Sequence, residues 1–371
     1  MALSLGLSSQ TTHLMTKKIA QKIRYVRTED GVQLAWAEAG DGPVMVKAAN
    51  WLTHLEYEWE SPVWRHWMRF FPGHFRYVRY DVRGCGMSDW NVGELSLERW
   101  VDDLEAVIDA ANPKEPFAMF GMSQGVAICV AYAVRNPERV SHLVLFGGFA
   151  RGTFLRGNPM KDQIYRAMID LVRLGWDKDN PAFRQIFTSL FVPGANDEQM
   201  GWFNELCRKT TSPDFAARLL ETLATVDVTD LLEKVVTPTL VLHSRGDAVV
   251  PISEGHFLAA GISGAQFIEL DSKNHVLLET DPAWERFCNE VLDFVGVNKY
   301  NGEDAAFAAL SRREREILAL LTQGLGNAQI AEHLSISEKT VRNHVTNLFD
   351  KLGVWTRAQA IVFAHNRNFS G

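Results

Sequence analysis

Short apolar runs alternate with stretches of helical periodicity from about Ile23 to Val295. The expected strands are Ile23–Arg27, Val32–Ala37, Val44–Ala48, Phe75–Asp81, Phe117–Phe120, Val140–Phe146, Thr239–His243 and Gln266–Leu270. Several of these runs are continuously apolar, as is typical of parallel strands covered on both faces. Helical stretches such as Leu97–Ala111 and Ala127–Arg135 separate them, and strand–helix–strand units form right-handed crossovers. The pattern therefore predicts an α/β domain with a mostly parallel sheet.

A change of pattern divides the chain, whose 371 residues leave room for two to three domains of about 150 residues each. The strand signal stops between Gly148 and about Val235, where only helices are expected. Such an insertion predicts a cap over the carboxyl edge of the sheet. The polar, glycine-containing segment 298–305 predicts a linker. We expect a tail (1–20), an α/β core (21–148 and 236–297), a helical cap (149–235), a linker (298–306) and a small all-α domain (307–371).

The net charge of −7 is unevenly distributed along the chain. From Ala305 to Gly371 the chain carries eight basic and five acidic residues, a net charge of +3, so the remainder carries −10. An acidic body with a basic C-terminal part indicates that an anionic partner such as nucleic acid contacts only the C-terminal part.

The four cysteines, Cys85, Cys129, Cys207 and Cys288, lie far apart and form no CxxC pair. Their spacing argues against a zinc ribbon, a redox pair and a disulfide framework, and favours reduced thiols in a cytoplasmic protein. The N-terminus lacks the basic region and long apolar core of a signal peptide. No run approaches 18 apolar residues, so we expect no membrane contact. We also expect no metal and no cofactor.

The pentapeptide Gly121-Met122-Ser123-Gln124-Gly125 follows the apolar strand FAMF and precedes the helical run VAICVAYAV. In this strand–turn–helix context, G-x-S-x-G presents a serine nucleophile. Glycines two residues on either side of the serine let the strand and helix backbones approach closely. The Gln124 N–H then lies beside the helix dipole, where it can join an oxyanion hole. A plain glycine-rich turn is the alternative.

An acid and a histidine are expected to follow the serine in that order. Asp247 comes directly after the strand TLVLH, and His275 comes after the strand QFIEL. In this arrangement Ser123 is the nucleophile, His275 is the general base and Asp247 orients the imidazole. A turn aspartate and a loop histidine are the alternatives. Asp271, four residues before His275, is a rival acid, to which we prefer Asp247.

Residues 21–297 resemble the α/β-hydrolase family. The matching elements are D-x-R-G-x-G-x-S-D at 81–89, the G-M-S-Q-G pentapeptide, G-D-x-x-V-P at 246–251 and the late His275. The resemblance implies the α/β-hydrolase fold and a site that attacks an ester, lactone or amide. The sequence departs from the family at Asn50-Trp51, where His-Gly is usual, and at Asn274, where Gly is usual. Both departures predict slow turnover.

The second oxyanion donor is expected from the loop AANWLTHLEYEW, which follows the third strand. The Trp51 N–H is our preferred donor, with Asn50 behind it. A Trp51 side chain that only packs the pocket wall is the alternative. The residues Trp51, Trp59, Trp64, Trp67, Trp176 and Trp202 suggest an apolar or aromatic ligand, although core packing explains many such side chains equally well.

Four amphipathic segments follow from Ser311 to the C-terminus. Their predicted boundary residues are Ser311 and Glu314 (a capping box), Gly324, Asn327 (an N-cap), Gly353, and Thr356 and Gln359 (a second box). The turn Ser335-Ile336-Ser337 separates a short helix from a longer helix over Glu338–Leu352. A short helix, a tight turn and a longer helix predict a helix-turn-helix.

One face of the longer helix is apolar and the opposite face is basic and polar. The apolar positions are Val341, Val345, Leu348 and Leu352. The outer face carries Lys339, Arg342, Asn343, Thr346, Asn347 and Lys351. Cations can contact phosphates, and Arg and Asn can pair with guanine and adenine edges. A solvated face of a small bundle is the alternative.

Residues 310–364 resemble the LuxR-type (GerE-like) DNA-binding domain along its whole length. The matching elements are R-E-R-E-I-L, G-L-x-N-x-x-I-A, I-S-x-K-T-V-x-N-H and K-L-G-V. By position, the resemblance implies that Arg342, Asn343 and Thr346 face bases. It also implies that the residues holding phosphates are Lys339, Thr340, Asn347 and Lys351, with His344 beside them. Trp355 departs from the family, in which a small polar residue is usual.

Two hypotheses follow for the whole chain. In the first, it is a cytoplasmic homodimeric transcriptional regulator that binds double-stranded operator DNA and senses a small apolar or aromatic ligand in its hydrolase-fold domain. In the second, it is a serine hydrolase, slow and esterase- or lactonase-like, that the DNA-binding part localises or regulates. The first is favoured because fusion to a ligand-binding domain gives a DNA-binding module a ligand input. Fusion to a purely metabolic esterase gives such a module no obvious benefit.

Overall fold

The computed structural model describes residues 19–297, 307, 310–366 and 369. The chain forms two compact units that divide at Cys288. Most of the predicted tail (1–20) and all of the predicted linker (298–306) lie outside the described residues. Their assignment therefore stays a prediction.

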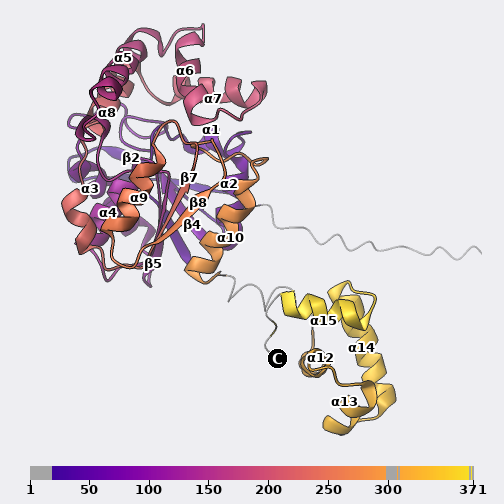
Figure 1. Cartoon of the computed structure of the whole chain (residues 1–371). Helices are drawn as coiled ribbons and strands as arrows, with labels where there is room; N and C mark the ends of the chain where they lie inside the picture. Colours follow the sequence, from indigo (N-terminus) through magenta and orange to yellow (C-terminus); the bar gives the residue numbers. More distant parts are fainter. Residues whose placement is uncertain (1–18, 298–306, 308–309, 367–368, 370–371) are drawn as a thin grey trace, which may run out of the picture. The chain divides into compact units, whose positions relative to one another are not determined.

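An eight-stranded sheet forms the centre of the first unit (Figure 1). Its strands are β1 (Lys22–Arg27), β2 (Gln33–Ala39), β3 (Val44–Lys47), β4 (Arg76–Tyr80), β5 (Phe117–Met122), β6 (Val140–Phe146), β7 (Thr239–Ser244) and β8 (Gln266–Leu270). They lie in the order β1-β2-β4-β3-β5-β6-β7-β8. The pairs β1–β2 and β2–β4 are antiparallel, and all others are parallel. The predicted mostly parallel α/β sheet is confirmed.

Helices cover both faces of the sheet (Figure 1). One face carries α2 (Arg65–His74) and the start of α10 (Ala283–Val295), and the other carries α3 (Leu97–Ala111), α4 (Gly125–Arg135) and α9 (Ile252–Gly261). Trp67 of α2 packs against Phe287 and Phe120, with ring centroids 5.0 and 6.0 Å apart. Trp67 is therefore a core residue. Core packing was the alternative to a ligand contact that the sequence left open for this side chain.

A helical insertion, residues 149–235, joins β6 to β7. Its elements are η1 (Thr153–Leu155), α5 (Pro159–Gly175), α6 (Ala182–Phe191), α7 (Asp197–Thr210), α8 (Pro213–Leu223) and η2 (Thr229–Lys234). In Figure 1, α5, α6 and α7 gather at one end of the strands. The insertion is tied to the turn after β4, because the Thr211 hydroxyl donates to the Gly84 carbonyl at 2.6 Å and the Gly86 N–H donates to the Thr210 carbonyl at 2.8 Å.

The second unit contains α12 (Arg312–Thr322), α13 (Asn327–His333), α14 (Glu338–Leu352) and α15 (Arg357–Asn366). Ile317, Leu321 and Val341 are among the fully buried side chains of its apolar core. The predicted capping box is confirmed, since Glu314 N–H donates to Ser311 Oγ and Ser311 N–H donates to Glu314 Oε2.

The predicted N-cap of α13 is wrong by one residue. Asn327 is the first helical residue, and Gly326 occupies the cap with φ −73° and ψ 165°. The Gln329 side chain accepts the Gly326 N–H at 2.8 Å. A glycine adopts this extended cap conformation as readily as an asparagine does. The capping interaction at the start of α13 is made by the glutamine side chain rather than by an asparagine side chain.

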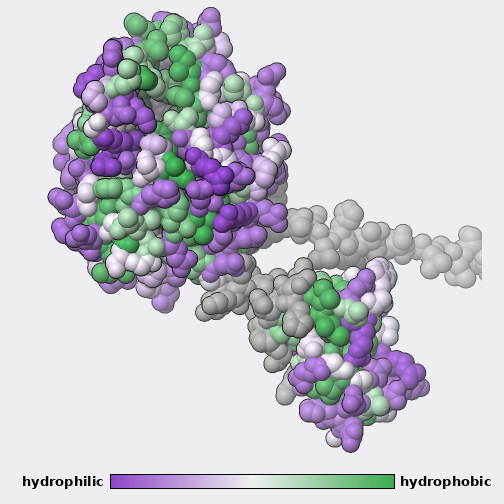
Figure 2. Space-filling model, in the orientation of Figure 1, coloured by the Kyte–Doolittle hydropathy of each residue, from purple (hydrophilic) through white to green (hydrophobic). Residues whose placement is uncertain are grey.

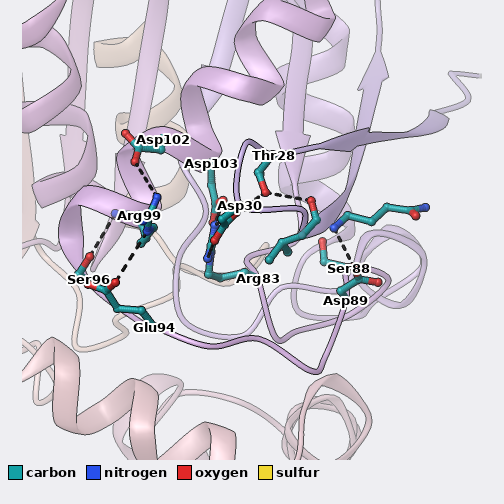
Figure 3. Close-up of polar contacts among 12 residues, drawn as sticks. Thr28, Asp30, Arg83, Ser88, Asp89, Glu94, Ser96, Arg99, Asp102 and Asp103 are labelled. Carbon is teal, nitrogen blue, oxygen red and sulfur yellow. Dashed lines mark hydrogen bonds and ion pairs between the residues drawn. The ribbon is translucent and has the colours of Figure 1, made fainter.

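The turn at residues 81–89 is braced by a buried ion-pair network (Figure 3). Arg83 Nε lies 2.7 Å from Asp103 Oδ2, and Arg83 Nη1 lies 2.7 Å from Asp30 Oδ2. The side chains of Arg83 and Asp103 are 1% and 0% exposed. The hydrogen bond from Arg83 lowers the pKa of Asp30 to about 2. Arg83 thus ties this turn to α3 and to the β1–β2 connection.

Replacing Arg83 by methionine is expected to lower the free energy of unfolding by about 3–5 kcal/mol, because Asp103 is left buried without its partner. Urea unfolding of the full chain measures this. Arg99→Met is the matched control, since Arg99 forms exposed pairs at 3.6 Å with Asp102 and 3.9 Å with Glu94, whose loss costs below about 1 kcal/mol. Equal losses in the two variants would contradict the assignment of Arg83 as the brace.

Candidate functional site

Ser123 lies in the sharp turn between β5 and α4, with a φ of 52° and 6% exposure. A positive φ is strained for a serine and is common where a side chain is presented for function. The flanking glycines are required by close backbone contacts. A Cβ on Gly121 would lie 2.8 Å from the Gly125 carbonyl oxygen, and one on Gly125 would lie 3.0 Å from that of Ala48.

The structure brings Asp247 and His275 together. His275 Nδ1 lies 2.6 Å from Asp247 Oδ2, and both side chains are 1% exposed. The other carboxylate oxygen of Asp247 accepts the N–H groups of Val249 and Val250 at 2.8 and 2.9 Å. The rival acid Asp271 is instead 90% exposed and lies 3.6 Å from Arg245. The geometry favours Asp247 as the partner of the histidine.

Two glycines after β6 border all three predicted triad residues. A Cβ on Gly147 would lie 3.4 Å from His275 Cε1 and 3.6 Å from Asp247 Oδ2. A Cβ on Gly148 would lie 2.9 Å from the Ser123 carbonyl oxygen. The Gly-Gly pair at the end of an apolar strand was the sequence signal for this close approach, and our sequence reasoning missed it.

The second nitrogen of the histidine is not joined to Ser123 by a hydrogen bond in the described structure. His275 Nε2 is buried and has no hydrogen-bond partner among the described residues. This is the nitrogen that takes the serine proton in a Ser-His-Asp triad. Sequence reasoning also missed His243, whose Nε2 contacts the Val250 carbonyl at 2.9 Å and lies 3.8 Å from Asp247 Oδ2. Burial lowers the pKa of His243, which favours its neutral form beside the acid.

Neither predicted oxyanion donor is otherwise engaged: within the described ranges, the N–H groups of Trp51 and Gln124 have no acceptor. The backbone of Trp51 is held by Asn50, whose side-chain amide donates to the Trp51 carbonyl at 3.2 Å and accepts a hydrogen bond from Lys47. Burial lowers the pKa of Lys47 to about 8. Lys47 ends an otherwise apolar strand, which is a signal that sequence reasoning did not use.

The Trp51 ring also packs the wall of the site. Its centroid lies 5.8 Å from that of Trp176 and 6.4 Å from that of Phe187, both from the helical insertion. The ring of Trp51 can therefore pack the wall while its backbone N–H remains available as a donor. The sequence presented these two roles as alternatives.

A small, largely enclosed cavity lies beside His275. Its lining residues are Asn50, Trp51, Leu52, Trp64, Met122, Phe191, Phe203, Leu206, His275 and Val276. Its volume is about 10 Å³, roughly what one water molecule needs. Three lining residues carry a buried ring nitrogen that has no partner in the described part of the chain: Trp51, Trp64 and His275. In this conformation the cavity is polar enough for a hydrogen-bonding group but too small for a substrate.

The end of α6 closes this cavity through contacts with the histidine loop. The Phe191 carbonyl accepts the N–H groups of His275 at 2.9 Å and Val276 at 3.2 Å. The Phe191 ring meets the imidazole edge-on, with centroids 5.2 Å apart. Asn274 accepts the Gly194 N–H at 2.8 Å and donates to Asp281 Oδ2 at 2.7 Å. The asparagine that replaces the usual glycine therefore fastens the insertion to the loop of His275.

Helix α14 presents the predicted DNA-contacting residues on its outer face. Val341 and Leu348 are fully buried beneath it. The exposed residues are Lys339, Arg342, Asn343, Thr346, Asn347 and Lys351, and the half-buried ones are Thr340 and His344. Within the described part of the chain, the Arg342 side chain has only an exposed contact with Glu338, at 3.4 Å. It is therefore free to reach another partner.

Lys351 differs from the other cations of this face. Its ammonium lies 2.7 Å from Glu314 Oε2 of α12, and Glu314 is 3% exposed. Burial alone would raise the pKa of Glu314, but hydrogen bonds from Lys351 and Ser311 outweigh it and the pKa is lowered. Lys351 thus joins α14 to α12, in addition to any contact with phosphate.

Metal sites and membrane-spanning helices are absent from the described ranges. These ranges contain no cluster of His, Cys, Asp and Glu side chains that could hold a metal ion. None of their helices is long and apolar enough to cross a membrane. The four cysteines are unpaired thiols.

Comparison with known proteins matches both parts of the chain. Residues 68–282, more than half of the chain, match the family model of serine aminopeptidase S33, and residues 308–364 match that of bacterial regulatory proteins of the luxR family. The chain is 26% identical over 257 residues to the AB hydrolase superfamily protein YisY of Bacillus subtilis, covering 68% of this chain and 91% of that protein.

The C-terminal part has its own relatives. It is 55% identical over 53 residues to the spore germination protein GerE of Bacillus subtilis, covering 14% of this chain and 72% of GerE. Among solved structures, an esterase from Exiguobacterium antarcticum superposes with a TM-score of 0.63 at 21% identity, covering 73% of this chain and 98% of the esterase, which shows a shared fold. The chain therefore belongs to the serine aminopeptidase S33 family of α/β-hydrolases and carries a C-terminal LuxR-family helix-turn-helix DNA-binding domain.

Proposed function

We propose that this protein is a transcriptional regulator that senses a small apolar or aromatic molecule in the cavity beside His275. The observation that carries this proposal is the size of the cavity, about 10 Å³, closed by Phe191. A ligand larger than a water molecule requires the helical insertion to move. Its binding therefore selects a conformation other than this one, and such a difference between two states is what a sensor needs. The insertion acts as the cap of the site.

The lining residues support an ester, lactone or amide as the ligand class. Aromatic and aliphatic side chains make most of the wall, with Phe191 and Phe203 contributed by the insertion. The buried indole nitrogens of Trp51 and Trp64 lack acceptors among the described residues, and burial of an unpaired polar group is costly. A ligand that carries a carbonyl or similar acceptor can satisfy them, whereas a pure hydrocarbon cannot.

DNA recognition is assigned to α14. Arg342, Asn343 and Thr346 face bases, and the phosphate contacts come from Lys339, Thr340, Asn347 and Lys351, with His344 beside them. A single short helix reads only a few base pairs, so we propose a cytoplasmic homodimer on a two-fold symmetric operator.

A second candidate function is hydrolysis by Ser123, His275 and Asp247. The 2.6 Å contact between His275 and Asp247 and the positive φ of Ser123 favour it. In this mechanism His275 Nε2 takes the serine proton, Asp247 holds the imidazole, and the N–H groups of Gln124 and Trp51 stabilise the oxyanion. Because the cap must open for each substrate, we expect turnover to be slow. Slow hydrolysis of the sensed ligand is compatible with regulation.

Arg342→Ala is expected to weaken binding to the specific operator by about 1–3 kcal/mol and to relax its selectivity, because a base contact is lost. The measurement is a titration of specific and random DNA duplexes at one salt concentration. Lys339→Ala is the matched control, since loss of a phosphate contact weakens binding to both duplexes alike. An unchanged ratio of specific to random affinity in Arg342→Ala would show that this side chain does not read bases.

Experiments on Ser123 distinguish the two candidate functions. A fluorophosphonate probe is expected to label Ser123 in the wild-type chain but not in His275→Ala, because the serine then lacks its base. Ser123→Ala should abolish hydrolysis and retain ligand-dependent control of a reporter promoter. Loss of control in Ser123→Ala would favour the hydrolase, and absence of labelling in a folded wild-type sample would remove the catalytic role.

A further inference from the structure

Helix α5 of the insertion carries an apolar stripe on its solvent side. The stripe consists of Met160, Ile164, Ala167, Leu171 and Leu174, spaced by four, three, four and three residues. Met160, Ile164 and Leu174 are 67%, 53% and 68% exposed. This spacing places all five side chains along one line, as in the seam of a coiled coil.

The stripe is distinct from the face that holds α5 in the protein. Ile169 and Val172 are buried, and α5 packs chiefly against α8. A surface helix normally has one apolar face, turned to the core. Most of the second apolar face of α5 is therefore left to solvent, with only Leu171 half-buried.

The apolar surface continues onto α6. Phe183 and Ile186 are 38% and 41% exposed, and the Phe183 ring lies over the backbone of Gly175, where a Cβ would come within 2.2 Å of it. Figure 2 shows green, hydrophobic surface at the end of the molecule where α5 and α6 lie in Figure 1. Contiguous exposed apolar surface of this kind marks interaction sites.

We propose that this stripe is the interface of the homodimer, with α5 of one copy packed antiparallel against α5 of a second copy. This inference rests on the homodimer of the proposed function, and it identifies the surface through which the two copies associate. The stripe is almost symmetric about Ala167. An antiparallel pairing therefore sets Met160 against Leu174 of the partner subunit and Ala167 against itself. A small residue at the crossing point lets the two backbones approach.

The residues that flank the stripe fit the same pairing. Gln163 and Asp170 lie on one side of it, and antiparallel packing sets each Gln163 beside Asp170 of the partner subunit. A side-chain amide donates to a carboxylate placed beside it, and no like charges meet across this flank. The contact is isologous, so it produces a closed two-fold dimer, which is the symmetry that a two-fold operator requires.

This interface would also connect the ligand site to the dimer. Helix α5 ends at Trp176, its C-cap residue, and the Trp176 ring lies 5.8 Å from that of Trp51 in the cavity wall. Movement of the insertion on ligand binding therefore moves the helix that pairs the two copies.

The test is the oligomeric state of the full chain by analytical ultracentrifugation. Wild type is expected to be a dimer, and the variant Ile164→Glu with Leu174→Glu is expected to raise the dimer dissociation constant at least tenfold. Both positions are exposed, so the fold should tolerate the charges. Val236→Glu is the matched control, because Val236 is 77% exposed and lies outside the stripe; it should remain a dimer.

Cysteine crosslinking tests the antiparallel register. Ala167→Cys is expected to give a covalent dimer on oxidation, because the two copies meet at this residue, whereas Arg166→Cys, one position around the helix, should not. A dimer that persists in the double glutamate variant and fails to crosslink at Ala167 overturns this inference and leaves the homodimer intact. That result would place the contact elsewhere, as at the 84% exposed Trp355. A monomeric wild type overturns both the inference and the proposed homodimer.

Discussion

The carbonyl of Phe191 is the contact on which the state of the site depends. It accepts two N–H groups, those of His275 and Val276, so the insertion and the proposed general base are held by the same bonds. Exchanging a hydrogen bond within the protein for one to water costs about 0.5–1.5 kcal/mol. Opening the cavity exposes both groups and also breaks the contact between Gly194 and Asn274. We propose that these contacts together favour the closed state by a few kcal/mol, which a ligand supplies when it opens the cavity.

This coupling explains how one pocket can serve a regulator and a hydrolase. The proposed elements of catalysis in the closed state are the strained Ser123, the contact of His275 with Asp247, and the unengaged N–H groups of Gln124 and Trp51. No hydrogen bond among the described residues joins Ser123 to His275 Nε2. Access to them requires the same movement that would signal ligand binding. In the proposed hydrolase the cost of opening would slow turnover, whereas in the proposed sensor the same cost would separate the empty state from the occupied one. The asparagine at position 274 contributes to that cost, which a glycine could not.

Much of the fold was predictable because it follows from local patterns. The strand ends shift by at most two residues, and the order of Ser123, Asp247 and His275 predicted which loops meet. The closed cavity was not predictable, because it depends on how side chains of separate helices pack. Asn274 could be recognised in the sequence as a departure from the glycine usual in the family. Its hydrogen-bond partner Gly194 lies 80 residues away, and no sequence pattern connects the two residues. The spacing of the α5 stripe is readable in the sequence, yet only the structure shows that it faces solvent.

We propose above all that ligand in the cavity and DNA on α14 bias the same equilibrium. Linkage then requires operator DNA to change the ligand's affinity by the factor by which the ligand changes operator affinity. The most direct measurement is calorimetric titration of the full chain with its small-molecule ligand, first alone and then saturated with operator duplex. We expect different ligand dissociation constants in the two titrations, and the same ratio in the reciprocal DNA titration. Identical constants would contradict it and leave the hydrolase domain without a regulatory role.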